Sequence, residues 1–195
     1  CELKFDGLAV SIVYQNGMLT TGATRGNGIV GENITNNIRT LKSVPHNILS
    51  NNDSFIDVRG EVYCPLDEFH KFNEERELQG LQTYSNPRNT ASGSLRQLNS
   101  DITAQRPLDI FIYAIGNNYG FQEYETHSET LNWLSTQGFK INEHQKLVHS
   151  IPEIIDYYTY WTEMRKSLNY DTDGIVIKVD SYEKQNILGT VARDP

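Results

Sequence analysis

The sequence predicts an α+β fold with antiparallel strands, and three observations support this. Short stretches alternate apolar and polar residues with the period of two that is typical of strands, beginning with residues 1–7. The pair Asn16-Gly17 separates two such stretches and is typical of a tight hairpin, because the type I′ turn needs positive φ at both central positions. Other stretches repeat apolar residues at helical spacing and open on capping residues.

Strands account for most of the first third of the chain. We expect strands over residues 8–14, 18–24 and 54–63, with a short helix or irregular turn over 32–40. The hairpin should return Arg25 toward the end of the chain that holds Lys4. After these strands a helix should begin at Pro65, because its Leu66, Phe69 and Phe72 recur at helical spacing and would face the core.

Later segments mix helices with two further strands. A strand is expected over 108–116, with Phe111 and Tyr113 on one face, and helices are expected over 126–137 and 150–168. The two aromatic side chains could equally be core residues or a platform for a nucleotide base.

Two segments of the second half carry charges that need an explanation. Residues 84–98 are small and polar and contain two arginines, which suits either a surface loop or a segment lying against phosphates. Residues 171–179 are expected to form an acidic turn that leads into a buried strand. Lys178 is the only charge in the apolar half of that strand, so its burial would need a partner such as a phosphate.

Composition excludes several classes of protein. The 195 residues carry a formal net charge of −8, which argues against a protein that coats nucleic acid through a basic surface. The segment 82–107 is nevertheless locally basic, with Asp101 as its only acid. No apolar run approaches the length of a membrane span, and two cysteines support neither a disulfide framework nor a zinc site.

The first seven residues carry the chemistry that the rest of the chain is expected to serve. Glu2, Lys4 and Asp6 alternate with Leu3 and Phe5, so a strand would place the three charged groups on one face. A lysine between carboxylates beside a glycine turn can be an amine nucleophile, although a surface lysine beside a turn is the simpler alternative. Lys-x-Asp-Gly is also the attachment motif of nucleotidyltransferases that form a covalent lysyl-nucleotide.

With that motif, the chain resembles the adenylation domain of the bacterial NAD-dependent DNA ligases, in five blocks that occur in the family's order. Asn27 and Asn33 depart from the family pattern, which usually has aspartate at both positions. The matching blocks are Cys1 to Gly7, Thr24 to Glu32, Val58 to Val62, Asn86 to Leu98 and Asp173 to Lys178.

The resemblance implies a nucleotidyltransferase (ATP-grasp-like) core of antiparallel sheets with flanking helices over residues 1–195. It implies NAD as the AMP donor, Mg²⁺ as a cofactor, nicked double-stranded DNA as a partner, a monomer, and the bacterial cytoplasm near the nucleoid. Because the chain begins at Cys1 and ends at Pro195, we expect a domain truncated at both ends. The parts expected to be missing are those that recognise nicotinamide mononucleotide, the oligonucleotide-binding fold, the zinc module, the helix-hairpin-helix region and the terminal BRCT domain.

Roles for individual residues also follow from the resemblance. Lys4 would take AMP, with Asp6 and Asp173 tuning the charge around it. The nucleotide would be held by Glu2 at the adenine, Arg25 and Glu61 at the ribose and neighbouring groups, Tyr113 stacked on the base and Lys178 at the α-phosphate. The DNA phosphates would be contacted by Arg88, Arg96 and Arg165. No residue is assigned as a metal ligand.

Lys4 must be neutral to attack phosphorus. A free lysine has a pKa of about 10.4, and nearby cations such as Arg25, Lys178 and Mg²⁺ would favour the neutral amine, whereas Glu2 and Asp6 would oppose it. Two alternatives remain open from the sequence. One is an ATP-dependent polynucleotide ligase, and the other is a non-catalytic module that keeps the fold and binds nucleotide or DNA.

Overall fold

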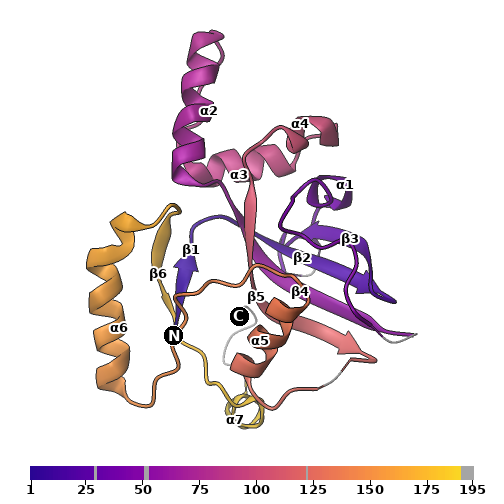
Figure 1. Ribbon diagram of the computed structural model, residues 1–195, viewed down its shortest axis with the longest axis vertical. Coiled ribbons are helices and arrows are strands. Elements are labelled where there is room, and N and C mark those ends of the chain that lie inside the picture. The colour runs from indigo at the N-terminus through magenta and orange to yellow at the C-terminus, as the bar shows by residue number, and fades with distance from the viewer. Residues whose placement is uncertain (29, 51–52, 122, 190–195) are drawn as a thin grey trace.

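Two antiparallel sheets form the centre of the protein. The computed structural model describes residues 1–28, 30–50, 53–121 and 123–189, so the last six residues lie outside the described part. The larger sheet has the strand order β3-β2-β4-β5, and the smaller one pairs β1 with β6 (Figure 1). The strands are β1 (Glu2–Phe5), β2 (Leu8–Gln15), β3 (Met18–Thr24), β4 (Phe55–Tyr63), β5 (Asp109–Tyr119) and β6 (Thr172–Val176).

The hairpin at Asn16-Gly17 is confirmed. Both residues have positive φ, 50° and 75°, and they join β2 to β3. Asn16 also accepts a hydrogen bond from the backbone of Ser54, 3.0 Å away, which ties the turn to the start of β4. The β2 and β3 strands therefore pair as expected and bring the Arg25 end of the hairpin back beside Ala9, whose carbonyl accepts from the Arg25 backbone at 3.0 Å.

The core lies on one face of the four-stranded sheet. Alternate residues of β2, β4 and the edge strand β5 face it, as the period of two requires. These residues are Val10, Ile12 and Tyr14 of β2, Ile56, Val58 and Val62 of β4, and Ile110 and Ile112 of β5. The helix α5 (His127–Thr136) covers this face with Leu131 and Leu134, and the short α1 (Thr35–Ile38) covers it with Ile38.

A stack of aromatic rings joins the two sheets. Phe5 of β1 lies against Phe111 of β5 with ring centroids 4.8 Å apart, and Phe111 lies against Tyr63 at 4.9 Å. The ring of Tyr170 meets the edges or faces of all three at 5.1–5.8 Å. Because Phe5 separates Lys4 from Asp6, this stack fixes the end of β1 that carries Lys4 and the residue Asp6 that follows the strand.

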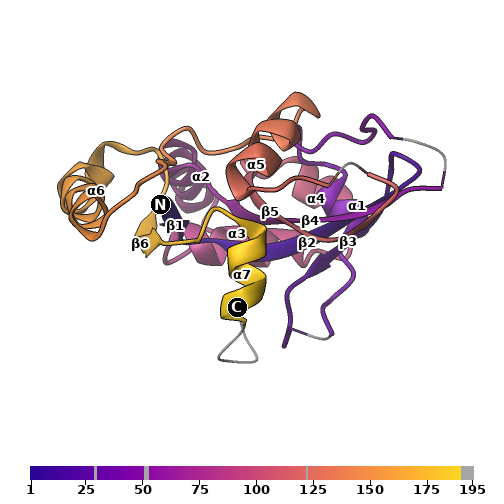
Figure 2. The same ribbon diagram turned by 90° about the horizontal axis from the view of Figure 1, so that it is seen from below.

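Helices surround the sheets. The helices expected from Pro65, over 126–137 and over 150–168 are present with small shifts at their ends, whereas residues 87–95, 100–104 and 182–188 form helices that the sequence analysis did not predict. Figure 2 shows α7 projecting from the sheets on the side away from α5. The remaining helices are α2 (Leu66–Leu78), α3 (Pro87–Leu95), α4 (Ser100–Ala104), α6 (Ile151–Met164), which continues into a 3-10 turn at Arg165–Ser167, and α7 (Tyr182–Leu188). None of the helices in the described ranges is both long and apolar enough to cross a membrane.

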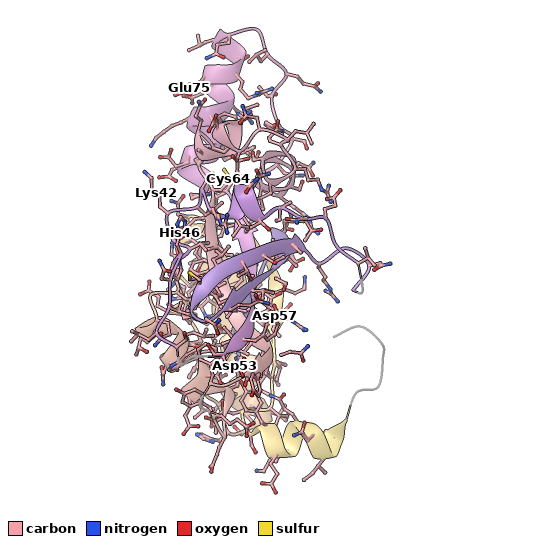
Figure 3. All side chains as sticks on the ribbon, turned by 90° about the vertical axis from the view of Figure 1, so that its right-hand side faces the viewer. Lys42, His46, Asp53, Asp57, Cys64 and Glu75 are labelled. Atoms are coloured by element: carbon pink, nitrogen blue, oxygen red, sulfur yellow. The ribbon has the colours of Figure 1, made fainter. Side chains whose placement is uncertain are left out.

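The helix α2 stands out from the rest of the molecule. Cys64 lies where β4 passes into α2, and Glu75 lies along the projecting part of the helix (Figure 3). Phe69 is the buried residue of its apolar stripe, while Leu66 and Phe72 are only half-buried. The expected core stripe is thus confirmed at Phe69 and is shallow at the other two positions.

Residues 84–98 contain the helix α3 and are not the surface loop that was one of the two expectations for this stretch. Asn86 caps α3 by accepting from the Asn89 backbone at 2.7 Å, and Pro87 occupies the first turn. Thr90 and Ala91 are fully buried, as are Ser94 and Leu95. The small residues therefore serve close packing of the helix against the sheet.

The last strand is not buried as predicted. Residues of β6 are half-buried or exposed, and Ile177 just beyond it is 57% exposed. In the described part of the chain β6 pairs with β1 alone, and this two-stranded sheet is not covered on both faces as a buried apolar strand would need. The apolar residues of β6 are therefore not part of the buried core.

Candidate active site

Lys4 lies on β1 opposite a bulge in β6. The pairing runs from Lys4 with Gly174 directly to Phe5 with Thr172, so Asp173 is the extra residue of the bulge. A bulge redirects the side chain of its extra residue. Here Asp173 places both carboxylate oxygens 2.7 Å from Lys4 Nζ, and this pair is about half exposed. The expected partnership of Lys4 and Asp173 is therefore present.

Asp6 and Gly7 complete the turn after the lysine. Asp6 accepts a hydrogen bond from Arg88 of α3 at 2.7 Å, and its backbone N–H donates to the Asp171 carbonyl at 3.0 Å. A Cβ at Gly7 would lie 2.2 Å from the carbonyl oxygen of Val62 on β4. The glycine of the motif is thus required by the close approach of two strands.

Glu61 of β4 lies within electrostatic reach of Lys4. Its carboxylate accepts from the backbone N–H of Gly7 and is also close enough to Arg88 and Asp6 to feel their charges. Burial raises the pKa of Glu61 to about 7, even though Arg88, Gly7 and Lys4 act in the opposite direction. Glu61 can therefore gain or lose a proton near neutral pH.

Glu2 stands at the other end of β1 in a compact charged cluster. One of its oxygens is 2.6 Å from His127 Nε2, and the other accepts from Lys178 Nζ at 2.8 Å. Burial opposes ionisation, yet the contacts with His127 and Lys178 hold the pKa of Glu2 below its ordinary value. Burial lowers the pKa of Lys178, and Glu2 acts against that effect.

Tyr113 adds an aromatic ring beside this cluster. The ladder passes from Gly60 with Ile112 to Arg59 with Ala114, so Tyr113 is the extra residue of a second bulge. Its carbonyl accepts from Lys178 Nζ at 2.9 Å, and the same Nζ lies 5.4 Å from the ring centroid. Burial raises the pKa of Tyr113 to about 12, so the ring is a neutral surface on which a base could stack.

The strands β1, β4 and β5 bring together the residues that the sequence analysis expected to bind the nucleotide. Glu61 and Arg25 are both near enough to Tyr113 to affect its pKa electrostatically. The end of the hairpin that carries Arg25 therefore lies in the same region. Lys178 differs from expectation in its partner. A carboxylate and a backbone carbonyl hold it, both from residues expected at the base, Glu2 and Tyr113.

The three arginines expected at DNA have separate positions. Arg88 pairs with Asp6 and so belongs to the Lys4 end of the site. Arg96, at the end of α3, pairs with Glu32 through Nε at 2.7 Å, with both side chains more than half exposed. Arg165 is exposed after α6 and lies within electrostatic reach of Asp171. Each of these cations thus has an acid nearby.

Two residues of this region were missed by the sequence analysis. His127, whose side chain is 9% exposed, contacts Glu2 across 125 positions of sequence, and Arg59 is near enough to Tyr113 to act on it electrostatically. Arg59 shares a strand face with Glu61, a signal that was visible in the alternation of β4. His127 gave no such signal, because only the fold brings it to Glu2.

Among the described residues, no group of three or more histidine, cysteine, aspartate or glutamate side chains is arranged to hold a metal ion. The acids near Lys4 are instead engaged with Lys4, Arg88 and the Gly7 backbone. These residues do not by themselves fit a protein cage for Mg²⁺.

Comparison with known proteins gives a consistent result. The family model "NAD-dependent DNA ligase adenylation domain" matches residues 1–195. The chain is 49% identical over 195 residues to the DNA ligase of Dehalococcoides mccartyi strain 195 and 48% identical over 194 residues to that of Carboxydothermus hydrogenoformans. A Listeria monocytogenes DNA ligase is 48% identical over 195 residues. In each case the whole chain is covered, and it spans 29% of the relative's length.

Proposed function

The chain belongs to the NAD-dependent DNA ligase adenylation domain family, and from that premise we propose that Lys4 takes AMP from NAD as a covalent lysyl-AMP. The observation that carries the proposal is the placement of Lys4 near Asp173, Arg88-bound Asp6 and Glu61, on the same strand as Glu2, which pairs with Lys178. Residues 1–195 would act as one adenylation domain of a longer ligase. That ligase would pass AMP to the 5′-phosphate of a DNA nick, and the adjacent 3′-hydroxyl would then displace it.

The spacing of β1 suits a nucleotide that lies along the strand. Glu2 and Lys4 are two residues apart, which separates their Cα atoms by about 6.7 Å in an extended strand. Glu2 and Lys178 would recognise the polar edge of adenine, with Tyr113 against its face, while Lys4 meets the α-phosphate. This arrangement supports a place for Lys178 at the base, in contrast to the α-phosphate role that the family resemblance implied.

The reaction requires Lys4 to leave its ion pair. Asp173 holds Lys4 Nζ through both oxygens, and a lysine in that state cannot attack phosphorus with a lone pair. Glu61, whose pKa is about 7, can accept a proton near neutral pH and lies within electrostatic reach of Lys4.

NAD is the substrate that supplies AMP, and nicotinamide mononucleotide is the leaving group. Mg²⁺ would reach the site with the phosphates of the nucleotide, because the described residues offer no cage of their own. Its chemistry would be to neutralise charge on the transferring phosphate. We further propose that the full ligase is a monomer, acts on nicked double-stranded DNA, and works in the bacterial cytoplasm near the nucleoid.

The alternatives have less support. The matching family is the NAD-dependent class, which disfavours an ATP-dependent polynucleotide ligase. A non-catalytic module is disfavoured because the lysine, its acidic partner in the β6 bulge and the expected base-binding residues are all present together.

We expect residues 1–195 to bind AMP measurably in calorimetry, since the base-binding residues all lie within the chain. Replacement of Tyr113 by alanine should weaken binding about tenfold, because base stacking on an aromatic ring is worth roughly 1–3 kcal/mol. Tyr119→Ala is the matched control, since Tyr119 ends the same strand and is 63% exposed. Equal losses in the two variants would contradict the placement of the base.

Nicotinamide mononucleotide provides a second control for the same experiment. We propose that residues other than 1–195 of the full ligase recognise nicotinamide mononucleotide, so it should show no saturable binding to this chain. Tight binding would mean that the nicotinamide half of NAD is also held by residues 1–195.

For DNA, the structure supports a positioning role for Arg96 and little affinity from this domain alone. Each neutralised phosphate contributes a slope of about 0.9 in log affinity against log salt, and three contacts are few for a chain of net charge −8. Because the arginines already face acids, we expect no detectable nicked-duplex binding by residues 1–195 at moderate salt.

In a full-length ligase that carries this domain, Arg96→Ala should slow nick sealing at least tenfold while lysine adenylation stays within about twofold. The reason is that Arg96 sits at the end of α3 with only exposed Glu32 as its partner, away from the Lys4 contacts. Lys71→Ala removes an equally exposed cation from α2 and should affect neither step. Equal loss of both steps in Arg96→Ala would assign Arg96 to the nucleotide pocket or to the fold.

A further inference from the structure

His127 has no role in the chemistry described so far, yet it makes the shortest contact in the base-binding cluster. Its Nε2 lies 2.6 Å from Glu2 Oε1, with a side chain only 9% exposed against 13% for Glu2. The other oxygen of Glu2 is taken by Lys178. Each oxygen of the Glu2 carboxylate therefore has its own partner, His127 for Oε1 and Lys178 for Oε2.

The position of His127 is fixed by its own helix end. It is the first residue of α5, where Thr126 and Glu129 form a capping box. Its backbone N–H donates to the carbonyl of Asp180 at 2.8 Å, and its ring meets the edge of Tyr182 at 6.5 Å. These contacts leave the imidazole little freedom, so it can act as a rigid support for Glu2.

The hydrogen-bond geometry sets which nitrogen of the ring carries a proton. An ionised carboxylate can only accept, so the 2.6 Å contact requires the hydrogen on Nε2. Lys178 Nζ lies 3.2 Å from the same Nε2, and it cannot donate to a nitrogen that already bears hydrogen. The two donors therefore do not bond each other, and both point to Glu2.

We propose that His127 is a positioning residue that holds the Glu2 carboxylate, and through it Lys178, in the orientation that recognises the adenine base. The proposal rests on the function proposed above. Without His127, one oxygen of a nearly buried carboxylate would lose its donor, and Glu2 would turn either toward solvent or fully onto Lys178. Either movement would disturb the pair that faces the nucleotide.

The test is AMP binding by residues 1–195, measured by calorimetry together with thermal unfolding. His127→Leu removes the donor and should weaken AMP binding about tenfold. His127→Gln places an amide N–H close to the position of Nε2 and should stay within about threefold of wild type. Rescue by glutamine is not expected of a side chain that serves packing alone, because leucine would fill the same space at least as well.

A double-mutant cycle shows whether His127 acts through Glu2. In a Glu2→Ala background, His127→Leu should cause no further loss of AMP affinity. An equal loss in both backgrounds, or equal losses for leucine and glutamine, would overturn the inference. Wild-type-like binding by His127→Leu would overturn this inference alone, whereas absence of AMP binding by the wild-type chain would overturn the proposed function with it.

Discussion

Replacement of Lys4 by alanine is expected to abolish the covalent AMP adduct in a full-length ligase that carries this domain. Peptide mapping after incubation with NAD and Mg²⁺ should place an AMP-sized mass increment on Lys4 in the wild type and on no residue in the variant. The physical reason is that no other described lysine has the same neighbours, since Lys178 is enclosed by Glu2, Tyr113 and His127. ATP in place of NAD should give no adduct.

The same substitution should leave the fold intact. It removes a half-exposed ion pair with Asp173, and such pairs contribute about 1 kcal/mol or less. For a chain of this size that corresponds to a change of about 2–4 °C or less in the midpoint of thermal unfolding. Lys71→Ala, which removes an exposed ion pair on α2, should match this stability change and keep the adduct. An adduct on Lys178 or Lys184 in the wild type would refute the assignment of Lys4.

Much of the fold could be predicted because its signals are local. Alternation identified five of the six strands with small errors at their ends, and the positive φ of Asn16 and Gly17 followed from their residue types alone. The helices α5 and α6 could be predicted equally well, because Thr126 and Ser150 are residue types that cap the first turn of a helix. Each of these features depends on residues that are close in sequence.

The predictions that were wrong or missing concern features that depend on contacts between residues distant in sequence. The apolar run of β6 resembled a buried strand, but burial depends on what lies on either side, and only β1 pairs with it. The helix α3 was hidden because buried small residues such as Ala91 and Ser94 are chosen for close packing and give no strong apolar period. The bulges that turn Asp173 and Tyr113 into the site are likewise properties of paired strands.

The candidate site shows the same division. Alternation placed Glu2, Lys4 and Asp6 on one strand, yet the structure gives each a different partner from a different element. In the proposed function the order of these residues along the chain matches the order of the parts of the nucleotide, while Asp173, Arg88 and Lys178 supply the charged partner of each. The sequence analysis expected Asp173 near Lys4 but missed His127, which contacts Glu2.

Glu61→Gln is expected to raise stability above neutral pH while it impairs adenylation. The Glu61 pKa is about 7 in the folded protein against an ordinary value of 4.5, so the folded state binds this proton more tightly than the unfolded state. Its contribution to stability is therefore fully present below about pH 4.5 and is lost as pH rises through about 7. Relative to the glutamine variant, the wild type should lose up to about 3 kcal/mol of unfolding free energy between pH 4.5 and pH 8.

Urea unfolding of residues 1–195 at several pH values measures this difference directly, because other titrating groups largely cancel between wild type and variant. Glu75→Gln, on the exposed part of α2, should give a difference that changes little with pH. In the full-length ligase, Glu61→Gln should slow formation of lysyl-AMP at least tenfold, since a neutral amide can neither accept a proton nor balance the charge of Lys4. A stability difference that does not change with pH would show that the pKa of Glu61 is the same in the folded and unfolded protein. Any role of Glu61 in catalysis could then not be explained by a pKa raised through burial.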